Sequence, residues 1–302
     1  MSDPPTEARR LAQERAERRR ARDFSTADEL RERIRALGFE VTDRPDGSFD
    51  LSPEPALGTA GHRRVQYQQV PSVLESEPTF DVTVQWLSES WPEDVLRGIA
   101  SFRGFEGGRS VHHVVVETWP EPPGTWPDGV EAIRLAADPG FGAARSAGLR
   151  RSVGRMVLVA DGSVEAVGDP YGPLEDALSD PSVGIAGPYG LVTHDLRLFK
   201  EAEGPEVDAV EGYLMAFRRE LLAQGVSLDE RYRFYRAADI DLCFQAKALG
   251  LRVVRVDVPI LRHEHRRWAA TSEEERRRLS KRNFYRFLDR FRGRTDLLVT
   301  RR

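Results

Sequence analysis

The stretch FDVTVQWLSESWPEDVLRGIASFRGFEGGRSVHHVVVE, residues 80–117, sets the architecture of most of the chain. The apolar runs at 80–87 and 111–117 are short and rich in Val, as in buried strands. The segment 92–104 between them has the apolar spacing of a helix. A strand, a helix and a second strand in this order form the repeating unit of parallel sheets. We therefore expect a mostly parallel α/β sheet from this point of the chain onward.

The segments that follow continue the alternation. A short apolar run at 130–137 precedes an expected helix at 141–154 and a buried strand at 155–161, and a helix at about 239–249 precedes a strand at 251–259. In such sheets the ligand site lies beyond the carboxyl ends of the strands, so polar residues that follow strands are candidates for chemistry. These are Ser88 and Glu89, Glu117 and Thr118, and Asp161, Gly162 and Ser163.

The composition is that of an ordinary globular protein. With 302 residues and 40% hydrophobic content, the chain can form one large domain and a smaller one. The net charge of -4 gives no general attraction to nucleic acid or anionic membranes, although Arg is dense at 9–22 and 262–294. The single cysteine, Cys243, cannot form an internal disulfide. Because we find no secretory signal and no uncharged apolar stretch of about 18 residues, we expect a cytoplasmic protein.

The N-terminal part differs in composition from the rest of the chain. Sparse apolar positions among many charges predict a helix over 5–37, followed by two short strands around the Asp46-Gly47 turn. The stretch 53–78 contains Pro and Gly and is expected to be a linker. The sequence thus predicts a helical module at 1–52 and a larger domain at 79–302.

Two groups of residues could hold a metal ion. Asp161, Ser163 and Glu165 follow the buried strand, and their oxygens are ligands that Mg²⁺ or Mn²⁺ accepts when it holds phosphates. A plain Asp-Gly turn is the alternative for this loop. His263 and His265 are expected to end a later strand on the same side, where one could bind metal or phosphate. Two surface histidines in a basic loop are the alternative.

A third candidate is FYRAADIDLCFQAKALGLRV, residues 234–253, which places Asp239 and Asp241 at the start of an apolar helix. Asp239 could cap this helix, with Asp241 complementing its dipole. Alternatively, acids beside aromatic residues such as Tyr235 suit a pocket that binds a sugar-like acceptor and takes a hydroxyl proton.

The order of these segments resembles that of the family 2 glycosyltransferases, which have the GT-A fold. The resemblance covers about 80–265 and rests on VLVADGSVEAVGD, VEGYLMAFRRE, SLDERYRFYRAADIDLCFQAKALGLRV and ILRHEH, in that order. It implies a GT-A-like mixed, mostly parallel sheet flanked by helices. It also implies inverting transfer of a sugar from a nucleotide-diphosphate donor to a hydroxyl of a carbohydrate or lipid-linked acceptor, in the synthesis of a cell-surface glycan or glycoconjugate.

Carried over residue by residue, the resemblance makes Asp239 the catalytic base. Asp161 and Ser163 match the donor loop, and Asp161 with His263 would hold Mg²⁺ or Mn²⁺ near the pyrophosphate. Glu117 stands where the family has an acid that contacts the nucleotide base. The residues on the acceptor side would be Glu211, Gly212 and Tyr235.

The sequence departs from the family pattern at several positions. Ser163 replaces the second aspartate of the metal loop, and Ala238 replaces the glutamate that usually precedes the base. The first strand also lacks the usual Tyr-Asn. A metal site would then need Glu165 or His263. These departures leave open a second reading, a glycosyltransferase-like binding or scaffold protein with weakened catalysis.

The N-terminal stretch LAQERAERRRARDFSTADELRERIRALGFEVTDRPDG, residues 11–47, resembles the C-terminal tail of cysteinyl-tRNA synthetases, which helps engage tRNA. The resemblance ends near residue 50, and nothing like the synthetase HIGH or KMSKS signatures follows. RNA association is thus one alternative for the arginines at 18–20. A solvated helix face is the other, and it is the usual outcome for such a run.

The C-terminal stretch SEEERRRLSKRNFYRFLDRFRGR, residues 272–294, predicts a basic amphipathic helix whose Ser272 and Glu275 have the spacing of a capping box. Such a helix can pack on its own domain or rest on an anionic membrane, which would bring the protein to the inner membrane face. Its apolar stripe is Leu279, Phe284, Phe287, Leu288 and Phe291.

Overall fold

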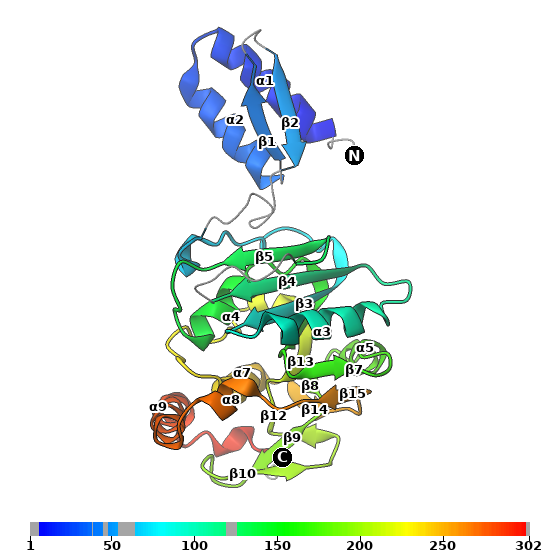
Figure 1. Cartoon of the computed structure of the whole chain (residues 1–302), viewed down its shortest axis with the longest axis vertical. Helices are drawn as coiled ribbons and strands as arrows, with labels where there is room; N and C mark the ends of the chain where they lie inside the picture. The colour runs from blue at the N-terminus through cyan, green and yellow to red at the C-terminus, as the bar shows by residue number, and fades with distance from the viewer. Residues whose placement is uncertain (1–5, 38, 45–47, 54–63, 119–125, 300–302) are drawn as a thin grey trace. The chain divides into compact units, whose positions relative to one another are not determined.

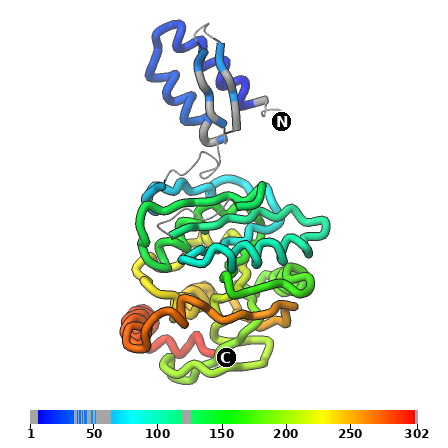
Figure 2. The backbone as a smooth tube through the Cα atoms, in the orientation of Figure 1, coloured from blue at the N-terminus to red at the C-terminus, as the bar shows by residue number. Residues whose placement is uncertain are grey.

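The computed structural model describes residues 6–37, 39–44, 48–53, 64–118 and 126–299 (Figures 1 and 2). The chain divides into two compact units, Met1–Gly61 and His62–Arg302, and each is described by itself. The turn predicted at Asp46-Gly47 and residues 54–63 of the expected linker lie outside the described residues.

The first unit contains α1 (Thr6–Arg20), α2 (Phe24–Ala36) and an antiparallel hairpin of β1 (Phe39–Asp43) and β2 (Phe49–Pro53). The prediction of one helix over 5–37 was wrong, because the chain breaks at 21–23. Arg22 has a φ of 62°, and the Asp23 carboxylate accepts a hydrogen bond from the Thr26 amide, which caps the start of α2.

The core of this unit joins both helices to the hairpin. Leu11, Leu30 and Ile34 are buried against one another. Arg15 is buried as well, and its guanidinium donates two hydrogen bonds of 2.7 and 3.0 Å to the Asp43 carboxylate. This bidentate pair ties α1 to the end of β1.

The second unit is built on an eight-stranded sheet with the order β11-β14-β8-β13-β6-β3-β4-β5. The strands β3, β4, β5 and β6 run parallel, as do β8 and β14, whereas β13 is antiparallel to both of its neighbours and β11 to β14. The expected mostly parallel α/β sheet is confirmed. The bounds are β3 (Phe80–Ser88), β4 (Val111–Glu117), β5 (Val130–Arg134), β6 (Gly154–Ala160), β8 (Val183–Gly187), β11 (Glu206–Val207), β13 (Leu214–Arg218) and β14 (Arg252–Arg255).

Helices cover both faces of this sheet because successive side chains of a strand point to opposite sides. In β6, Val157 and Val159 pack with α4 (Phe141–Leu149) and α7 (Ala238–Ala248). The alternate residues Met156 and Leu158 pack with α3 (Pro92–Arg103) and α5 (Gly172–Ser179) on the other face. Cys243 of α7 is fully buried, as expected of a core residue.

Smaller elements complete the second unit. β9 (Gly190–Thr193) pairs with β10 (Phe199–Ala202) and β12 (Ala209–Val210), and β7 (Val164–Ala166) pairs with β15 (Ile260–Arg262). The short helices are α6 (Glu220–Ala223), α8 (Arg266–Ala270) and the 3-10 turns η1 (Tyr67–Gln69) and η2 (Thr295–Leu297). The segment from residue 64 on, expected to be linker, packs on this unit: Val65 bridges to Leu135 and Val70 is buried in the core.

The last long helix, α9 (Glu273–Phe291), has Ser272 as its N-cap, and the Ser272 hydroxyl accepts a hydrogen bond from the Glu275 amide. The expected capping box is only half formed, because the Glu275 carboxylate accepts hydrogen bonds from Arg278 instead. Its stripe packs on its own unit: Phe287, Leu288 and Phe291 are buried with Phe244 of α7. This overturns the alternative of membrane contact through the stripe, because its central residues are already covered. Within the described ranges, the structure contains no helix with the length and apolarity to cross a membrane.

Candidate active site

A cavity of about 500 Å³ lies at the carboxyl end of β6, beside the start of α7. Asp161, Glu211 and Asp239 contribute carboxylates to its wall, and Tyr235 and His265 contribute rings. The cavity is at the edge of the sheet where the strand order predicts a ligand site. Residues more than 100 positions apart in the sequence therefore meet here.

Asp161 follows β6 directly, and its carboxylate is held from two sides. One oxygen accepts a 2.8 Å hydrogen bond from the Ser163 amide, and the other lies 3.4 Å from Nε2 of His265. Burial favours the neutral form, but the hydrogen bond and charge of His265 and the charge of Arg145 outweigh it and hold the pKa of Asp161 well below its usual range. Asp161 is therefore an anion throughout the neutral pH range.

Arg145 is a buried cation beneath this loop. It belongs to the otherwise small and apolar helix α4, and it donates hydrogen bonds to the carbonyls of Gln85 and Ala160, at 3.0 Å each, and to the Gln85 side chain. Burial lowers the pKa of Arg145 to about 10, and the negative charge of Asp161 opposes the shift. The guanidinium stays charged and connects the ends of β3 and β6. A lone arginine in the helix FGAARSAGL was the sequence signal for it.

His265 is the histidine that meets Asp161. Its Nδ1 accepts the Trp268 amide at the start of α8, so a neutral ring carries its proton on Nε2, toward Asp161. The ring also stacks on Tyr235, with centroids 4.5 Å apart.

The assignment of His263 to the metal site is corrected. Its Nε2 lies 2.7 Å from Glu165, across the β15–β7 pair. The two histidines were expected on one side of a strand, but β15 ends at Arg262 and the chain then turns into α8. Only His265 therefore reaches the cavity.

The loop after β6 offers few ligands for a cation. Within the described ranges, no three His, Cys, Asp or Glu side chains come together as a metal site. The Ser163 hydroxyl is buried beside Asp161 and has no hydrogen-bond partner in the described structure. Asp161 with this unsatisfied hydroxyl fits the kind of Mg²⁺ or Mn²⁺ site whose remaining ligands are phosphate oxygens and water.

Asp239 lies opposite, in the first turn of α7. One of its oxygens accepts the Gly212 amide and the other its neighbour Ile240, both at 2.9 Å. The alternative that Asp239 is the N-cap was wrong: Ala237 holds that position with a φ of 68°, and it makes no side-chain cap. The carboxylate is instead tied to the segment after β12.

The surroundings of Asp239 raise its pKa to about 6. Burial is the main cause, the negative charge of Glu211 adds to it, and the hydrogen bond from Gly212 partly offsets both. A carboxylate with a pKa near neutrality can be ionised at rest and still accept a proton readily. The first turn of α7 thus presents a base to the cavity.

Asp241, two residues on, faces away from the cavity. Its oxygens accept hydrogen bonds from Tyr232 at 3.1 Å, Gln245 at 2.6 Å and Arg290 at 3.0 Å, and it is buried. Of the two acids at this helix start, only Asp239 is placed for chemistry.

The acceptor-side residues predicted from the resemblance line the same cavity. Glu211 accepts a 3.0 Å hydrogen bond from Arg262, whose guanidinium lies 4.2 Å from the Tyr213 ring centre. Gly212 has no space for a side chain, because a Cβ there would lie 2.9 Å from Cβ of Asp239. The ring of Tyr235 packs edge-on against Phe141.

Glu117 is enclosed within the fold, which speaks against its assignment to a nucleotide base. It is fully buried, and its two oxygens accept hydrogen bonds from the Trp126 indole and from Nε of Arg134, the latter at 2.9 Å. Since both oxygens are satisfied inside the fold, Glu117 stabilises the end of β4.

A smaller cavity of about 40 Å³ adjoins Asp161 and His265 on the other side. Glu89, Arg266 and Arg267 contribute to its wall. Arg267 forms an ion pair with Glu89, and Arg266 lies 3.2 Å from Asp94. The anion Asp161 therefore stands between a mainly apolar, aromatic cavity and a narrow, strongly charged one.

Comparison with known proteins supports the fold. No family model matches the chain. The solved structure of GalNAc-T7 with UDP, GalNAc and Mn²⁺ is 15% identical, with a TM-score of 0.53, over 70% of this chain and 48% of that one. This chain thus spans about half the length of that protein, and at such identity the likeness shows the GT-A fold alone. The solved structure of the mannosyltransferase PcManGT from Pyrobaculum calidifontis with GDP-Man and Mn²⁺ is 19% identical, with a TM-score of 0.47. The match covers 63% of this chain and 59% of the mannosyltransferase.

A curated relative matches a short part of the chain. The cysteine–tRNA ligase of Bdellovibrio bacteriovorus (strain ATCC 15356 / DSM 50701 / NCIMB 9529 / HD100) is 56% identical over 39 residues, which are 13% of this chain and 8% of the ligase. This supports the resemblance seen in the N-terminal residues and extends to no other part of the ligase.

Proposed function

We propose that the second unit is a glycosyltransferase that moves a sugar from a nucleotide-diphosphate donor to a hydroxyl acceptor with inversion. The observation that carries the proposal is the pairing of two carboxylates at one cavity: Asp161 is held as an anion, and Asp239 has a pKa of about 6. The GT-A fold adds support.

In this mechanism Asp239 accepts the proton of the acceptor hydroxyl. The hydroxyl oxygen bonds to the anomeric carbon as the bond from that carbon to the diphosphate oxygen breaks, and the diphosphate leaves with the electron pair. Hydrogen bonds from the Gly212 and Ile240 amides orient the carboxylate toward the cavity. A single displacement of this kind needs one base on the acceptor side, and Asp239 supplies it.

The donor diphosphate would bind beside Asp161. A bound Mg²⁺ or Mn²⁺ supplies charge neutralisation for the leaving group, and Asp161 with the Ser163 hydroxyl would hold it. Nε2 of His265 contacts the second carboxylate oxygen of Asp161 and orients the group. His265 is also the main cause of the low pKa of Asp161, and the charge of Arg145 adds to it.

The acceptor would occupy the aromatic part of the cavity. Tyr189, Tyr213 and Tyr235 line this part, and Glu211 with its partner Arg262 adds charged hydrogen-bonding groups. These groups suit a carbohydrate, free or lipid-linked, as in the synthesis of a cell-surface glycan or glycoconjugate.

A titration tests the proposal. Isothermal titration calorimetry of the whole protein with UDP-, GDP- and dTDP-sugars, with and without Mn²⁺, should find one nucleotide whose binding strengthens with the metal. Transfer to carbohydrate acceptors is then measured with that donor. If none of the three nucleotide-sugars binds under either condition, the proposal fails.

A second candidate is a binding or scaffold protein with the same fold. The observations that favour it are the burial of Glu117 and the absence of a three-ligand metal group in the described part of the chain. This candidate predicts donor binding without transfer, so the transfer measurement that follows the titration separates the two candidates.

The first unit adds a proposal of its own: a separately folded module for RNA association. It rests on the 39-residue similarity to a tRNA ligase and on the exposed arginines at 18–20. Two of these, Arg18 and Arg19, already lie 3.5 and 3.3 Å from Asp23 and Asp43. Salt-sensitive binding of tRNA in a gel-shift experiment would support the role, and its absence would retire it.

A further inference from the structure

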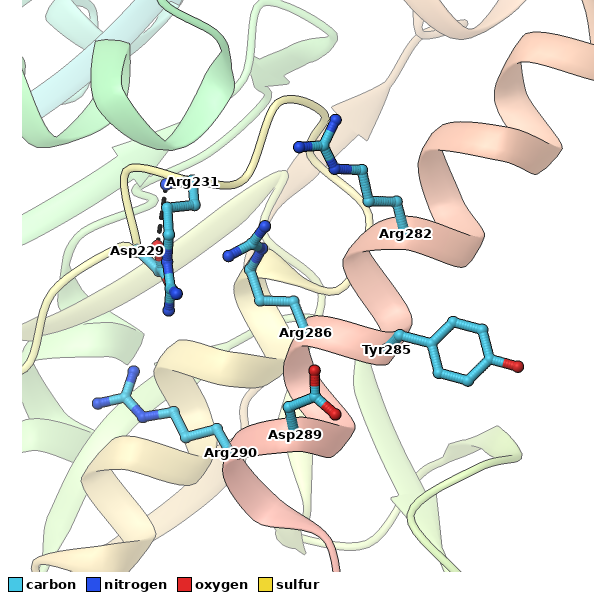
Figure 3. A pocket seen from close by; sticks show the side chains of 7 residues that line it. All are labelled: Asp229, Arg231, Arg282, Tyr285, Arg286, Asp289 and Arg290. Atoms are coloured by element: carbon cyan, nitrogen blue, oxygen red, sulfur yellow. Dashed lines mark hydrogen bonds and ion pairs between the residues drawn. The ribbon is translucent and has the colours of Figure 1, made fainter.

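A second large cavity, of about 540 Å³, lies between α9 and the loop that precedes α7 (Figure 3). It shares no lining residue with the candidate active site. Its wall carries four arginines and two aspartates, with Tyr285 at the margin. The lining residues are Asp229, Arg231, Arg282, Tyr285, Arg286, Asp289 and Arg290.

Three of the arginines come from one face of α9. Arg282, Arg286 and Arg290 are spaced four residues apart, which stacks them along the same side of a helix. Figure 3 shows the Arg286 and Arg290 side chains extending toward Arg231 on the facing loop, with Arg282 one turn earlier. The guanidinium groups therefore border one open space.

Acids balance two of the four arginines, since Arg231 pairs with Asp229 and Arg290 pairs with Asp241, and they leave Arg282 and Arg286 unbalanced. Asp229 is held by Arg231, with contacts as short as 2.6 Å, and the cation nearest Asp289 is Arg292 at 3.5 Å, outside the cavity. In the described part of the chain, Arg282 and Arg286 make no hydrogen bond or ion pair within 4 Å, and the charge of Arg286 reaches Asp229 only from a distance. Nε of Arg286 is moreover buried without a partner.

The first half of the same helix shows the contrast. There Arg277 pairs with Glu273 and Arg278 with Glu275, each at 2.6 Å. Like charges four residues apart disfavour a helix, and opposite charges three or four residues apart favour it. Along α9 the row has only Asp289, which pairs with Arg292, so an external anion would relieve the remaining repulsion.

We propose that this cavity, called here the arginine cavity, binds a compact group with several phosphates. Guanidinium groups match phosphate oxygens with paired hydrogen bonds, and one carboxylate would satisfy only one of them. Charges from two elements around one space favour a multivalent group, such as an oligophosphate or a multiply phosphorylated lipid headgroup. The inference does not depend on the proposed transfer reaction.

The arginine cavity is tested with tripolyphosphate as probe. Calorimetric titration of the whole protein at low ionic strength with EDTA should show binding that weakens with added salt. Replacing both free arginines, in Arg282→Gln/Arg286→Gln, should weaken it about tenfold or more, because two charged hydrogen-bonding groups are lost. Arg290 is left in place because it also binds Asp241.

Two controls locate the effect. Arg277→Gln/Arg278→Gln removes the same charge from the same helix, outside the cavity, and should leave the affinity within about twofold. Asp161→Ala should also leave it unchanged, which separates this site from the proposed donor site. Circular dichroism checks that each variant is folded.

Vesicles separate the two sources of the phosphates. Phosphatidylcholine vesicles carrying a phosphoinositide should sediment the protein if the ligand is a headgroup, and binding of tripolyphosphate alone indicates a free phosphate compound. Binding to either probe supports the proposed phosphate site if the Arg282→Gln/Arg286→Gln variant loses that binding. No binding to either probe, or equal weakening in both pairs of variants, would overturn it.

Discussion

The loop after β6 and the first turn of α7 each present a carboxylate to the same cavity, but the pKa values of the two carboxylates are shifted in opposite directions. Asp161 is surrounded by His265, Arg145 and a donated amide, and its pKa is held well below the usual range. Burial raises the pKa of Asp239 to about 6, and the negative charge of the neighbouring Glu211 adds to this rise. Burial raises the pKa of both carboxylates. Around Asp161 the hydrogen bond and charge of His265 and the charge of Arg145 reverse that direction, whereas at Asp239 the hydrogen bond from Gly212 offsets burial only in part.

This difference teaches how one cavity can contain both an anion and a base. A group that must hold positive charge has to stay ionised, whereas a group that must accept a proton needs a pKa near the working pH. The pKa values of two aspartates shifted in opposite directions would suit the two roles proposed above without any change of residue type.

The largest expected effect is at Asp239. Asp239→Asn keeps the shape and can still occupy the site, but it cannot take the proton, so the transfer rate should fall about 10²–10⁴-fold while donor affinity stays the same. Transfer rate and calorimetric donor affinity are measured on the same preparation. A folded variant with a near-normal rate would show that the raised pKa of Asp239 has no part in the reaction.

Asp161 should affect binding first. Asp161→Ala removes the anion of the loop and should weaken nucleotide-sugar affinity by about 1–3 kcal/mol in the presence of Mn²⁺. With EDTA, the wild type should fall to the level of the variant, because the carboxylate would then hold no cation. Equal affinity in the wild type and the variant under both conditions would remove Asp161 from the donor site.

The pH dependence of the transfer rate should report the protonation state of Asp239. A base works only when it is deprotonated, so the rate should rise about tenfold per pH unit below its pKa of about 6 and level off above it. Asp161 stays ionised around neutral pH, so it should add no second inflection to the pH–rate profile. The rate is followed from pH 5 to 8 at saturating donor, and a profile without a limb near 6 would contradict the assignment.

Two glycines provide the smallest and most local comparison. A Cβ at Gly212 would lie 2.9 Å from Cβ of Asp239, whereas a Cβ at Gly162, beside Asp161, finds its nearest atom at 3.3 Å. Gly212→Ala should therefore cost roughly 1–3 kcal/mol of unfolding free energy and shift the pH limb of transfer, because Asp239 must move.

Gly162→Ala is the matched control, with a smaller loss of stability and no change in the pH limb. Urea unfolding and the pH profile of each variant separate the two positions. If both alanine variants have the same unfolding free energy and the same pH profile of transfer, the close approach of Gly212 to Asp239 does not affect the pKa of Asp239.

Much of the fold followed from local patterns in the sequence. Strand and helix periodicity predicted the order of β3, α3, β4, α4 and β6 because each depends on the burial of side chains within a few residues of one another. The resemblance named Asp161, Glu211, Gly212 and Asp239. The aromatic residues before the helix pointed to Tyr235, and all five residues line one cavity.

Only the tertiary structure decided which charged side chains meet. His263 bonds to Glu165, 98 residues away, and His265 takes the place beside Asp161. Glu117 is enclosed by Trp126 and Arg134, and the stripe of α9 packs against Phe244. A residue's own sequence neighbours determine whether it lies in a strand or a helix, but its partners depend on how distant elements pack. For this reason the sequence predicted where the cavity forms and five of the residues that line it, whereas packing determined the partners of the charged side chains around it.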